Sequence, residues 1–218
     1  IVAALLIGLF IGVIGALMLD ALDSSIKGAD DLEKRIGMTA LTSLPRIIQD
    51  ENHTSLTLYE EKSESVFAEG VRTARTGLLL SAIDNPVRVF AVTSSLPSEG
   101  KTTFASNIAL ALAQNKSTLL IEADLRRPQL TKLFGLPADC KGLANLVSGD
   151  AMIEECLHPI EDSTLMVLPV GTLPPNPLGL LSSKRFEDTL AMFKERFEVI
   201  VLDTPPVEQV SDALIVAS

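Results

Sequence analysis

The chain has 218 residues, of which 47% are apolar and 21% are charged, a composition typical of a globular protein. The formal net charge of −10 argues against a non-specific nucleic-acid binder, because phosphate backbones require a broad cationic field. The two cysteines, Cys140 and Cys156, form neither a C-x-x-C motif nor a cluster with histidine. A disulfide scaffold and a zinc site are therefore disfavoured, and a reducing compartment is expected.

The N-terminal segment, residues 1–19, contains no charged side chain. As a helix rising 1.5 Å per residue it would be ~28 Å long, close to the thickness of the hydrocarbon core of a bilayer. Gly8, Gly12 and Ala16 have the small-xxx-small spacing that lets membrane helices approach closely. A signal peptide is disfavoured because no basic segment precedes the apolar run, and a buried core helix is the other alternative. We expect a transmembrane helix and, since Ile1 already lies inside the run, a fragment of a longer membrane protein.

Residues 20–64 are rich in acidic side chains and predict a juxtamembrane linker with a short helix near 30–36. Helical spacing of apolar residues returns at about 65–83 and marks the start of a domain over 65–218. Beyond it, β-rich apolar runs and helical patterns alternate. The predicted strands are 87–92, 118–123, 165–170 and 199–202, and the predicted helices are 103–113 and 185–196. Continuous apolar strands separated by helices indicate an α/β domain with a parallel sheet covered on both faces.

The strongest motif, SLPSEGKTT at 95–103, directly follows the first predicted strand. A strand that leads into Gly-Lys-Thr at the start of a helix is typical of a P-loop, because backbone N–H groups there point at phosphates. Lys101 is expected to contact the β- and γ-phosphates, and the Thr102 hydroxyl is expected to hold Mg²⁺. Ser95 stands where the usual pattern has its first glycine, and a plain surface turn is the alternative. The predicted nucleotide-binding residues are Ser98, Glu99, Gly100, Lys101, Thr102, Thr103 and Arg126.

Acidic residues end two of the predicted strands. Glu122 and Asp124 follow the second strand, and Asp203 follows the last one. The carboxyl ends of strands in open α/β sheets face the ligand crevice. A strand-terminal aspartate is also a common loop opener, but together with the P-loop these acids predict an Mg-nucleotide phosphoryl-transfer site. Thr102, Asp124 and Asp203 are the predicted metal ligands, and Lys101, Glu122, Asp124 and Asp203 are the predicted catalytic residues.

The combined motifs resemble those of a known family. The P-loop, the acid-x-Asp-x-Arg-Arg-Pro sequence at 122–128 and Asp-Thr-Pro-Pro at 203–206 look like those of the bacterial tyrosine kinases. These kinases are joined to, or partnered with, polysaccharide co-polymerases of capsule and exopolysaccharide export. Pro-Pro-Asn-Pro at 174–177, Leu-Leu-Ser-Ser at 180–183 and Ser-Asp-Ala-Leu at 211–214 add to the resemblance. It covers the whole chain, from the second transmembrane helix of the family into the kinase domain.

The resemblance implies an ATP-dependent protein tyrosine (auto)kinase that uses ATP and Mg²⁺ and regulates polysaccharide polymerisation, chain length and export. It implies a location at the bacterial inner membrane, with the kinase domain in the cytoplasm. The implied partners are other copies of the chain in a ring, the polysaccharide polymerase, the outer-membrane export machinery and a cognate tyrosine phosphatase. Glu122 is then the candidate base or orienting group for the incoming tyrosine hydroxyl.

Glu69, Arg72 and Arg75 match the E-x-x-R-x-x-R helix with which this family builds its ring. Their spacing of three places them along one side of a helix. A carboxylate and two guanidinium groups presented together suit bidentate pairing with a neighbouring protomer. The alternative is an ordinary solvated helix face.

Two alternatives to the kinase remain open. One is an ATPase of the MinD/ParA type. These ATPases carry a signature lysine five residues before the P-loop lysine, and this alternative is disfavoured because the chain has Leu96 there. A membrane-anchored, non-catalytic scaffold is favoured by two departures from the family. Glu122 replaces the usual aspartate, and misplacement by about 1 Å can cost ~10²-fold in rate. The chain contains one tyrosine, Tyr59, and lacks the tyrosine-rich tail, so the kinase domain over 65–218 is expected to be incomplete at its C-terminus.

Overall fold

The computed structural model describes residues 2–22, 28–46, 59, 64–81 and 87–207. The chain divides into two compact units, Ile1–Ser43 and Leu44–Ser218. The Ser-Asp-Ala-Leu sequence at 211–214 lies outside the described residues.

The first unit contains two helices, α1 (Val2–Leu22) and α2 (Ala29–Ile36). The expected helix over 1–19 is present as α1 and extends three residues further, to Leu22. The short helix predicted near 30–36 is confirmed as α2, which ends at Gly37 in the left-handed conformation. Within the described residues, no helix is both long enough and apolar enough to cross a membrane. The structure therefore does not support the assignment of this segment as a transmembrane helix.

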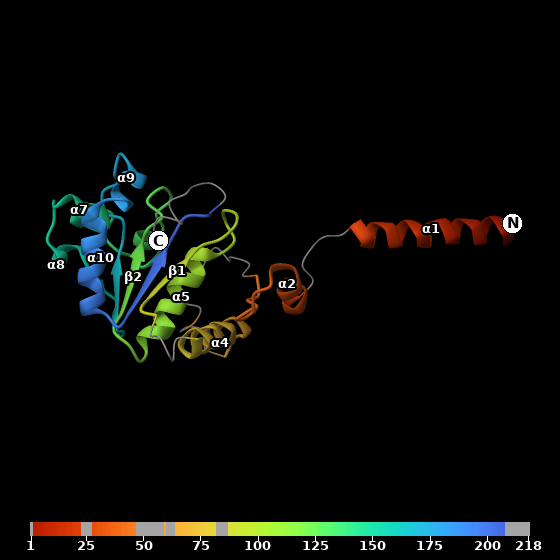
Figure 1. Ribbon diagram of the computed structural model, residues 1–218, viewed down its shortest axis with the longest axis horizontal. Coiled ribbons are helices and arrows are strands. Elements are labelled where there is room, and N and C mark those ends of the chain that lie inside the picture. Colours follow the sequence, from red (N-terminus) through yellow and green to blue (C-terminus); the bar gives the residue numbers. More distant parts are fainter. Residues whose placement is uncertain (1, 23–27, 47–58, 60–63, 82–86, 208–218) are drawn as a thin grey trace. The chain divides into compact units, whose positions relative to one another are not determined.

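The second unit is built on one sheet (Figure 1). Its strands within the described residues are β1 (Val89–Val92), β2 (Thr118–Glu122), β3 (His158–Pro159), β4 (Leu165–Leu168) and β5 (Val199–Asp203). Their order is β1-β5-β2-β4-β3. The four strands expected from the sequence are confirmed and run parallel to one another. The expectation of a parallel sheet needs one correction, because β3 pairs antiparallel with β4 at the edge.

Helices cover both faces of this sheet, as expected for strands that are apolar along their whole length. The described helices of the second unit are α4 (Val66–Ser81), α5 (Lys101–Ala113), α6 (Leu130–Leu133), α7 (Leu143–Ser148), α8 (Ile153–Cys156), α9 (Pro177–Leu181) and α10 (Lys184–Arg196). Leu120 and Val201 belong to the core cluster shared with α4 and α5. Leu119 and Ile200 belong to the cluster shared with α7 and α10. Neighbouring residues of one strand thus face opposite layers, as the β-strand pleat requires.

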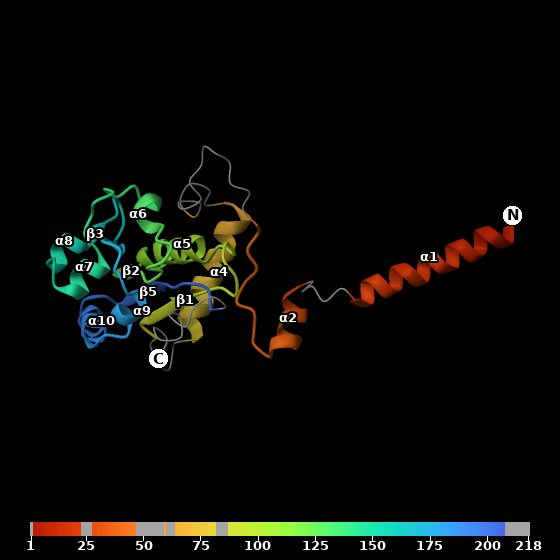
Figure 2. The same ribbon diagram turned by 90° about the horizontal axis from the view of Figure 1, so that it is seen from above.

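Helices α4 and α5 lie side by side on one face of the sheet (Figures 1 and 2). Two residues that precede α4 in the chain also pack into this face. Tyr59 is buried in its core cluster, and Leu44 is partly buried against it. This layer therefore includes residues of the segment predicted as linker, 20–64.

Candidate functional site

The segment between β1 and α5, residues 93–100, forms the P-loop predicted from the sequence. Ser98 and Gly100 have positive φ angles of 64° and 87°, and the glycine takes this conformation without steric cost. The carboxylate of Glu99 accepts a hydrogen bond of 3.0 Å from the Leu96 N–H, which closes the loop. No side chain caps the N-terminus of α5 at Gly100. An uncapped helix N-terminus after a strand suits an anionic group such as phosphate.

Lys101 and two acidic residues meet at the carboxyl edge of the sheet, that is, the side at which the parallel strands end. The Lys101 Nζ lies 2.8 Å from Asp124 Oδ2 and 3.7 Å from Asp203 Oδ1. The Lys101 side chain is 10% exposed, and those of Asp124 and Asp203 are 4% and 1% exposed. The acids come together because β2 and β5 are neighbours in register, with Glu122 opposite Asp203. The Thr102 hydroxyl lies 3.3 Å from the Lys101 Nζ, so Thr102 belongs to the same group.

Asp203 is the member of this group whose hydrogen-bonding capacity is least satisfied. Burial raises its pKa to about 7, although the Lys101 charge and the Thr102 hydroxyl lower it, and the nearby Glu122 and Asp124 raise it slightly further. Its buried Oδ1 has no hydrogen-bond partner among the described residues, because 3.7 Å to Lys101 is too long for one. A buried carboxylate oxygen without a partner is costly, so this position favours a bound cation.

The donor set fits Mg²⁺ together with a nucleotide. Mg²⁺ prefers oxygen ligands and is usually held by one or two carboxylates plus substrate phosphates. Asp124, Asp203 and the Thr102 hydroxyl offer such oxygens next to the P-loop. The described residues contain no cluster of three or more His, Cys, Asp and Glu side chains suited to a metal ion. Phosphate oxygens of a bound nucleotide would complete the coordination of such an ion.

Glu122 occupies a different environment from the one expected for a catalytic base. Its Oε1 accepts hydrogen bonds from the N–H groups of Gln129 and Leu130, and its Oε2 accepts one of 3.1 Å from Val170. Burial raises its pKa, the three N–H groups lower it, and the charge of Asp124 raises it. Both carboxylate oxygens are thus engaged by backbone at the start of α6 and the end of β4. This arrangement holds the segment after β2 in place.

The other residues predicted at the site lie around its rim or away from it. Ser98, Glu99 and Arg126 are exposed, and Thr103 is half-buried in the first turn of α5. Glu69, Arg72 and Arg75 lie on α4 outside this group. Arg72 pairs with Glu69 at 2.9 Å, and Arg75 donates to the Ala111 carbonyl at 3.0 Å.

Two threonines that were not predicted as site residues join β1 to β5 beside the P-loop. Thr93 Oγ1 donates to the Pro205 carbonyl at 2.8 Å, and the Thr204 N–H donates to the Val92 carbonyl at 3.0 Å. These bonds fasten the residues after Asp203 to the start of the P-loop. Thr204 lies within the Asp-Thr-Pro-Pro motif, so the motif itself was the available signal.

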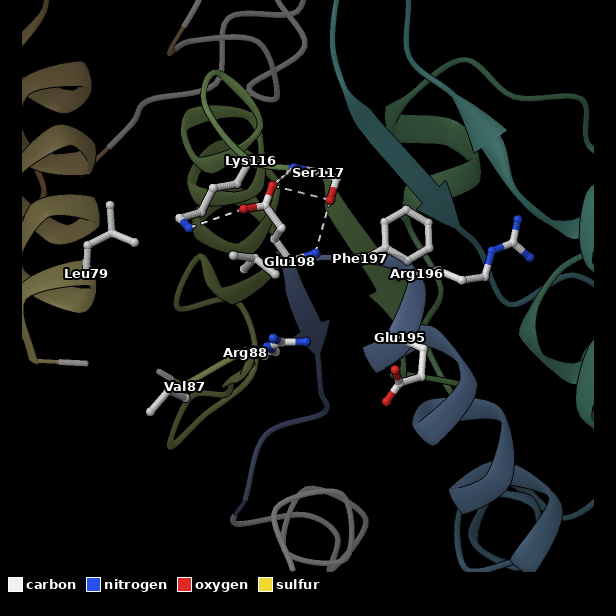
Figure 3. Close-up of a pocket in the computed structure, with 10 residues that line it drawn as sticks. Leu79, Val87, Arg88, Lys116, Ser117, Glu195, Arg196, Phe197 and Glu198 are labelled. Atoms are coloured by element: carbon white, nitrogen blue, oxygen red, sulfur yellow. Dashed lines mark hydrogen bonds and ion pairs between the residues drawn. The ribbon is translucent and has the colours of Figure 1, made fainter. Parts of the chain in front are cut away.

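A pocket of about 400 Å³ lies at the opposite edge of the sheet (Figure 3). It is lined by residues that precede the strands, including Arg88, Lys116, Ser117 and Glu198. Ligands of open α/β sheets bind at the carboxyl ends of strands. The P-loop, Lys101 and Asp203 lie at that end, and so the candidate site is there rather than in this pocket.

Known proteins include relatives of this chain. The tyrosine-protein kinase CpsD of Streptococcus agalactiae is 37% identical over 159 residues, which cover 72% of this chain and 67% of CpsD. This chain belongs to the bacterial tyrosine kinase family. A second member, the tyrosine-protein kinase Ptk of Acinetobacter johnsonii, is 29% identical over 225 residues, covering 99% of this chain and 31% of that protein.

The fold agrees with this family. The kinase domain of the Escherichia coli tyrosine kinase ETK superposes with a TM-score of 0.79 at 25% identity, covering 88% of this chain and 78% of that domain. No family model matches the chain. The chain spans about a third of the length of the Acinetobacter kinase.

Proposed function

We propose that this chain carries the phosphoryl-transfer site of an ATP-dependent protein tyrosine kinase that regulates polysaccharide polymerisation and export. The observation that carries the proposal is the buried group of Lys101, Asp124 and Asp203 under the P-loop, with Asp203 Oδ1 lacking a hydrogen-bond partner among the described residues. Membership of the bacterial tyrosine kinases supports the choice of tyrosine as acceptor.

The roles of the residues follow from their positions. Mg-ATP supplies the phosphoryl group, and catalysis of its transfer depends chiefly on positioning and on charge neutralisation. Lys101 binds phosphate oxygens, while Thr102, Asp124 and Asp203 hold the metal. Asp124 is itself held in place, because its Oδ1 accepts a hydrogen bond of 3.1 Å from the Arg127 N–H. Ser98, Glu99, Gly100, Thr103 and Arg126 are the remaining candidates for nucleotide contact.

The test is phosphotyrosine formation by the full-length protein with its native C-terminus. Asp203→Asn should abolish the activity, whereas Glu198→Gln should leave it unchanged, since Glu198 lies at the other end of β5 and lines the distant pocket. Normal Mg-ATP binding by the parent without any phosphotyrosine would instead favour the scaffold. That second candidate is supported by Glu122, whose two carboxylate oxygens are both occupied by backbone N–H groups.

Ring assembly through α4 is part of the proposal. Glu69 is its best-supported contact, because its side chain is 68% exposed, whereas Arg72 is 35% exposed and Arg75 bonds within the chain. Glu69→Ala should lower the mass of the assembly measured by light scattering, and Thr73→Ala on the same helix serves as the control. Equal masses for Glu69→Ala and the parent would make this an ordinary helix surface.

Attachment to the inner membrane through α1, with the kinase in the cytoplasm, also remains a proposal. Asp20 is the one charged residue of α1, and large apolar side chains such as Phe10 and Ile14 are exposed. Because no helix of the described residues spans a membrane, the attachment rests on this composition. Replacing Phe10 and Ile14 by lysine should release the protein from membrane fractions, whereas Leu41→Lys should not.

The polysaccharide polymerase, the outer-membrane export machinery and a cognate tyrosine phosphatase are the proposed partners. They follow from the resemblance to kinases joined to, or partnered with, polysaccharide co-polymerases. Co-purification of the full-length protein with its neighbours in the membrane tests them.

A further inference from the structure

Tyr59 is the one described residue between positions 46 and 64, and it is buried with 4% of its surface exposed. Its N–H donates to Asn107 Oδ1 at 3.0 Å, and its hydroxyl donates to Gln114 Oε1 at 3.0 Å. The guanidinium carbon of Arg72 lies 6.0 Å from the centre of the ring. Tyr59 is thus held by α4, by Asn107 in the middle of the P-loop helix α5 and by Gln114, the residue that caps the C-terminus of α5.

Asn107 connects Tyr59 to the first turn of α5. It is fully buried in the middle of the helix, where an amide side chain needs partners. Its Oδ1 accepts from the Tyr59 N–H at 3.0 Å, and its Nδ2 donates to the Thr103 carbonyl at 2.8 Å. One side chain therefore joins the backbone of Tyr59 to a residue two positions after Lys101.

Gln114 connects Tyr59 to the other end of α5 and to α4. Its Oε1 accepts hydrogen bonds from the Tyr59 hydroxyl at 3.0 Å and from Arg75 Nη1 at 2.9 Å. Arg75 Nη1 also donates to the Ala111 carbonyl at 3.0 Å, in the last turn of α5. A cation in that position interacts favourably with the helix dipole.

We propose that Tyr59 is a positioning residue whose docking on α4 and α5 couples the segment before the kinase domain to the P-loop. The inference rests on the proposed nucleotide binding. Docking of Tyr59 orders α5 from both ends, and Lys101 and Thr102 lie in the first turn of this helix. Linkage then requires that Mg-nucleotide strengthens Tyr59 docking by the same factor by which docking strengthens Mg-nucleotide binding. A tyrosine that merely filled the core would show no such coupling.

The chain provides its own reporter, since it contains one tyrosine and no tryptophan. Quenching of tyrosine fluorescence by acrylamide therefore measures the exposure of Tyr59 alone. Gln114→Met keeps the side-chain length but removes the shared acceptor, and Gln114→Glu keeps an acceptor for both donors. Asn115→Ala is the matched control, because Asn115 is the next residue along the chain and is exposed like Gln114.

In the chain of 218 residues, Gln114→Met should raise quenching and weaken Mg-ADP binding, each by ~2–10-fold, as expected for the loss of a hydrogen bond. Mg-ADP should lower the quenching of this variant again. Gln114→Glu and Asn115→Ala should both match the parent. A melting curve by circular dichroism verifies that each variant is folded.

Two results would overturn the proposal. The first is that Gln114→Met exposes Tyr59 but binds Mg-ADP as tightly as the parent. The second is that Tyr59 in the parent is already quenched as strongly as a freely accessible tyrosine. Absence of Mg-ADP binding in every variant would refute the proposed nucleotide site instead. The coupling is then decided without nucleotide, by amide exchange at Thr103 and Phe104. Faster exchange in Gln114→Met than in the parent supports the coupling, and equal exchange excludes it.

Discussion

The two edges of the sheet each carry a lysine paired with an acidic residue, in opposite environments. At the carboxyl edge, Lys101 and Asp124 are 2.8 Å apart, with side chains 10% and 4% exposed. At the amino edge, Lys116 and Glu198 are 3.5 Å apart, with side chains 36% and 56% exposed. The buried pair sits beside a further acid, Asp203, with an oxygen that lacks a partner among the described residues. The exposed pair lines the pocket of Figure 3.

Burial explains the difference between the two edges. It raises the pKa of Asp203 to about 7. At the amino edge, the Ser117 N–H is the main cause that lowers the pKa of Glu198, with a smaller contribution from Lys116. The Glu198 carboxylate therefore has hydrogen-bond partners within the chain, whereas the Asp203 carboxylate has an oxygen that a bound cation could pair with. The pocket at the amino edge thus lacks the electrostatics that favour a ligand at the carboxyl edge.

Removing the two lysines should give the largest contrast. Lys101→Met should weaken Mg-ADP binding by ~2–5 kcal/mol, about 30-fold to several thousand-fold, because a buried charged contact is lost. It should also lower the free energy of unfolding, since Asp124 and Asp203 remain buried without their cation. Lys116→Met should leave the affinity unchanged. Calorimetric titration measures the Mg-ADP affinities of the parent and of both variants. If Lys101→Met bound Mg-ADP as tightly as the parent, the P-loop assignment would be wrong.

Asp203→Asn should separate ligand binding from stability. The folded-state pKa of about 7 lies above the ordinary 3.8. The folded state therefore holds a proton that the unfolded state has lost, and stability falls as pH rises from about 4 to about 7. Without nucleotide, the variant should lose this pH dependence and gain on the order of 4 kcal/mol above pH 7 at most.

The same variant should bind Mg-ADP more weakly than the parent. Denaturant unfolding at pH 5 and pH 8, paired with titration, checks both expectations. A stability profile that still falls with pH in Asp203→Asn would place the responsible group elsewhere.

Substitutions at Glu122 test whether the carboxyl edge contains a structural acid beside the metal-binding ones. Glu122→Gln puts an amide donor against one of three backbone N–H groups, and should cost ~1–3 kcal/mol of unfolding free energy. Glu122→Asp is shorter and should also destabilise the fold. Exposed Glu154→Gln is the control. Unchanged stability with slower phosphotyrosine formation in Glu122→Gln would instead support the base role.

Changes to the exposed pair should have the smallest effects. Lys116→Met removes a solvent-exposed ion pair with Glu198, and such pairs contribute little to stability. Glu198→Gln should make stability less sensitive to acid, because a lowered pKa stabilises the folded state above the ordinary value, and this contribution is lost as pH falls. Thermal melts at pH 3 and pH 7 compare the variants. A change in Mg-ADP affinity from either substitution would show that the amino edge also contributes to nucleotide binding.

Much of the domain could be predicted from local sequence patterns. The apolar runs of β2 and β5, the helix α5 and the Gly-Lys-Thr at its start depend mainly on neighbouring residues. The meeting of Asp124 with Asp203 also followed, because parallel strands bring their carboxyl ends to one edge. The two-residue strand β3 was missed, since it is too short for any periodicity and contains a proline.

Tertiary structure alone decided the environments of Glu122 and Tyr59. The sequence placed Glu122 at a strand end, but its oxygens are occupied by Gln129, Leu130 and Val170, the last of these 48 residues away. The sequence placed Tyr59 in a linker, but its hydroxyl reaches Gln114 at the end of α5. Periodicity and motifs determine which element a residue joins. Which backbone and side-chain groups come within about 3 Å of it depends on how distant elements pack, and that distance sets both its hydrogen bonds and its pKa.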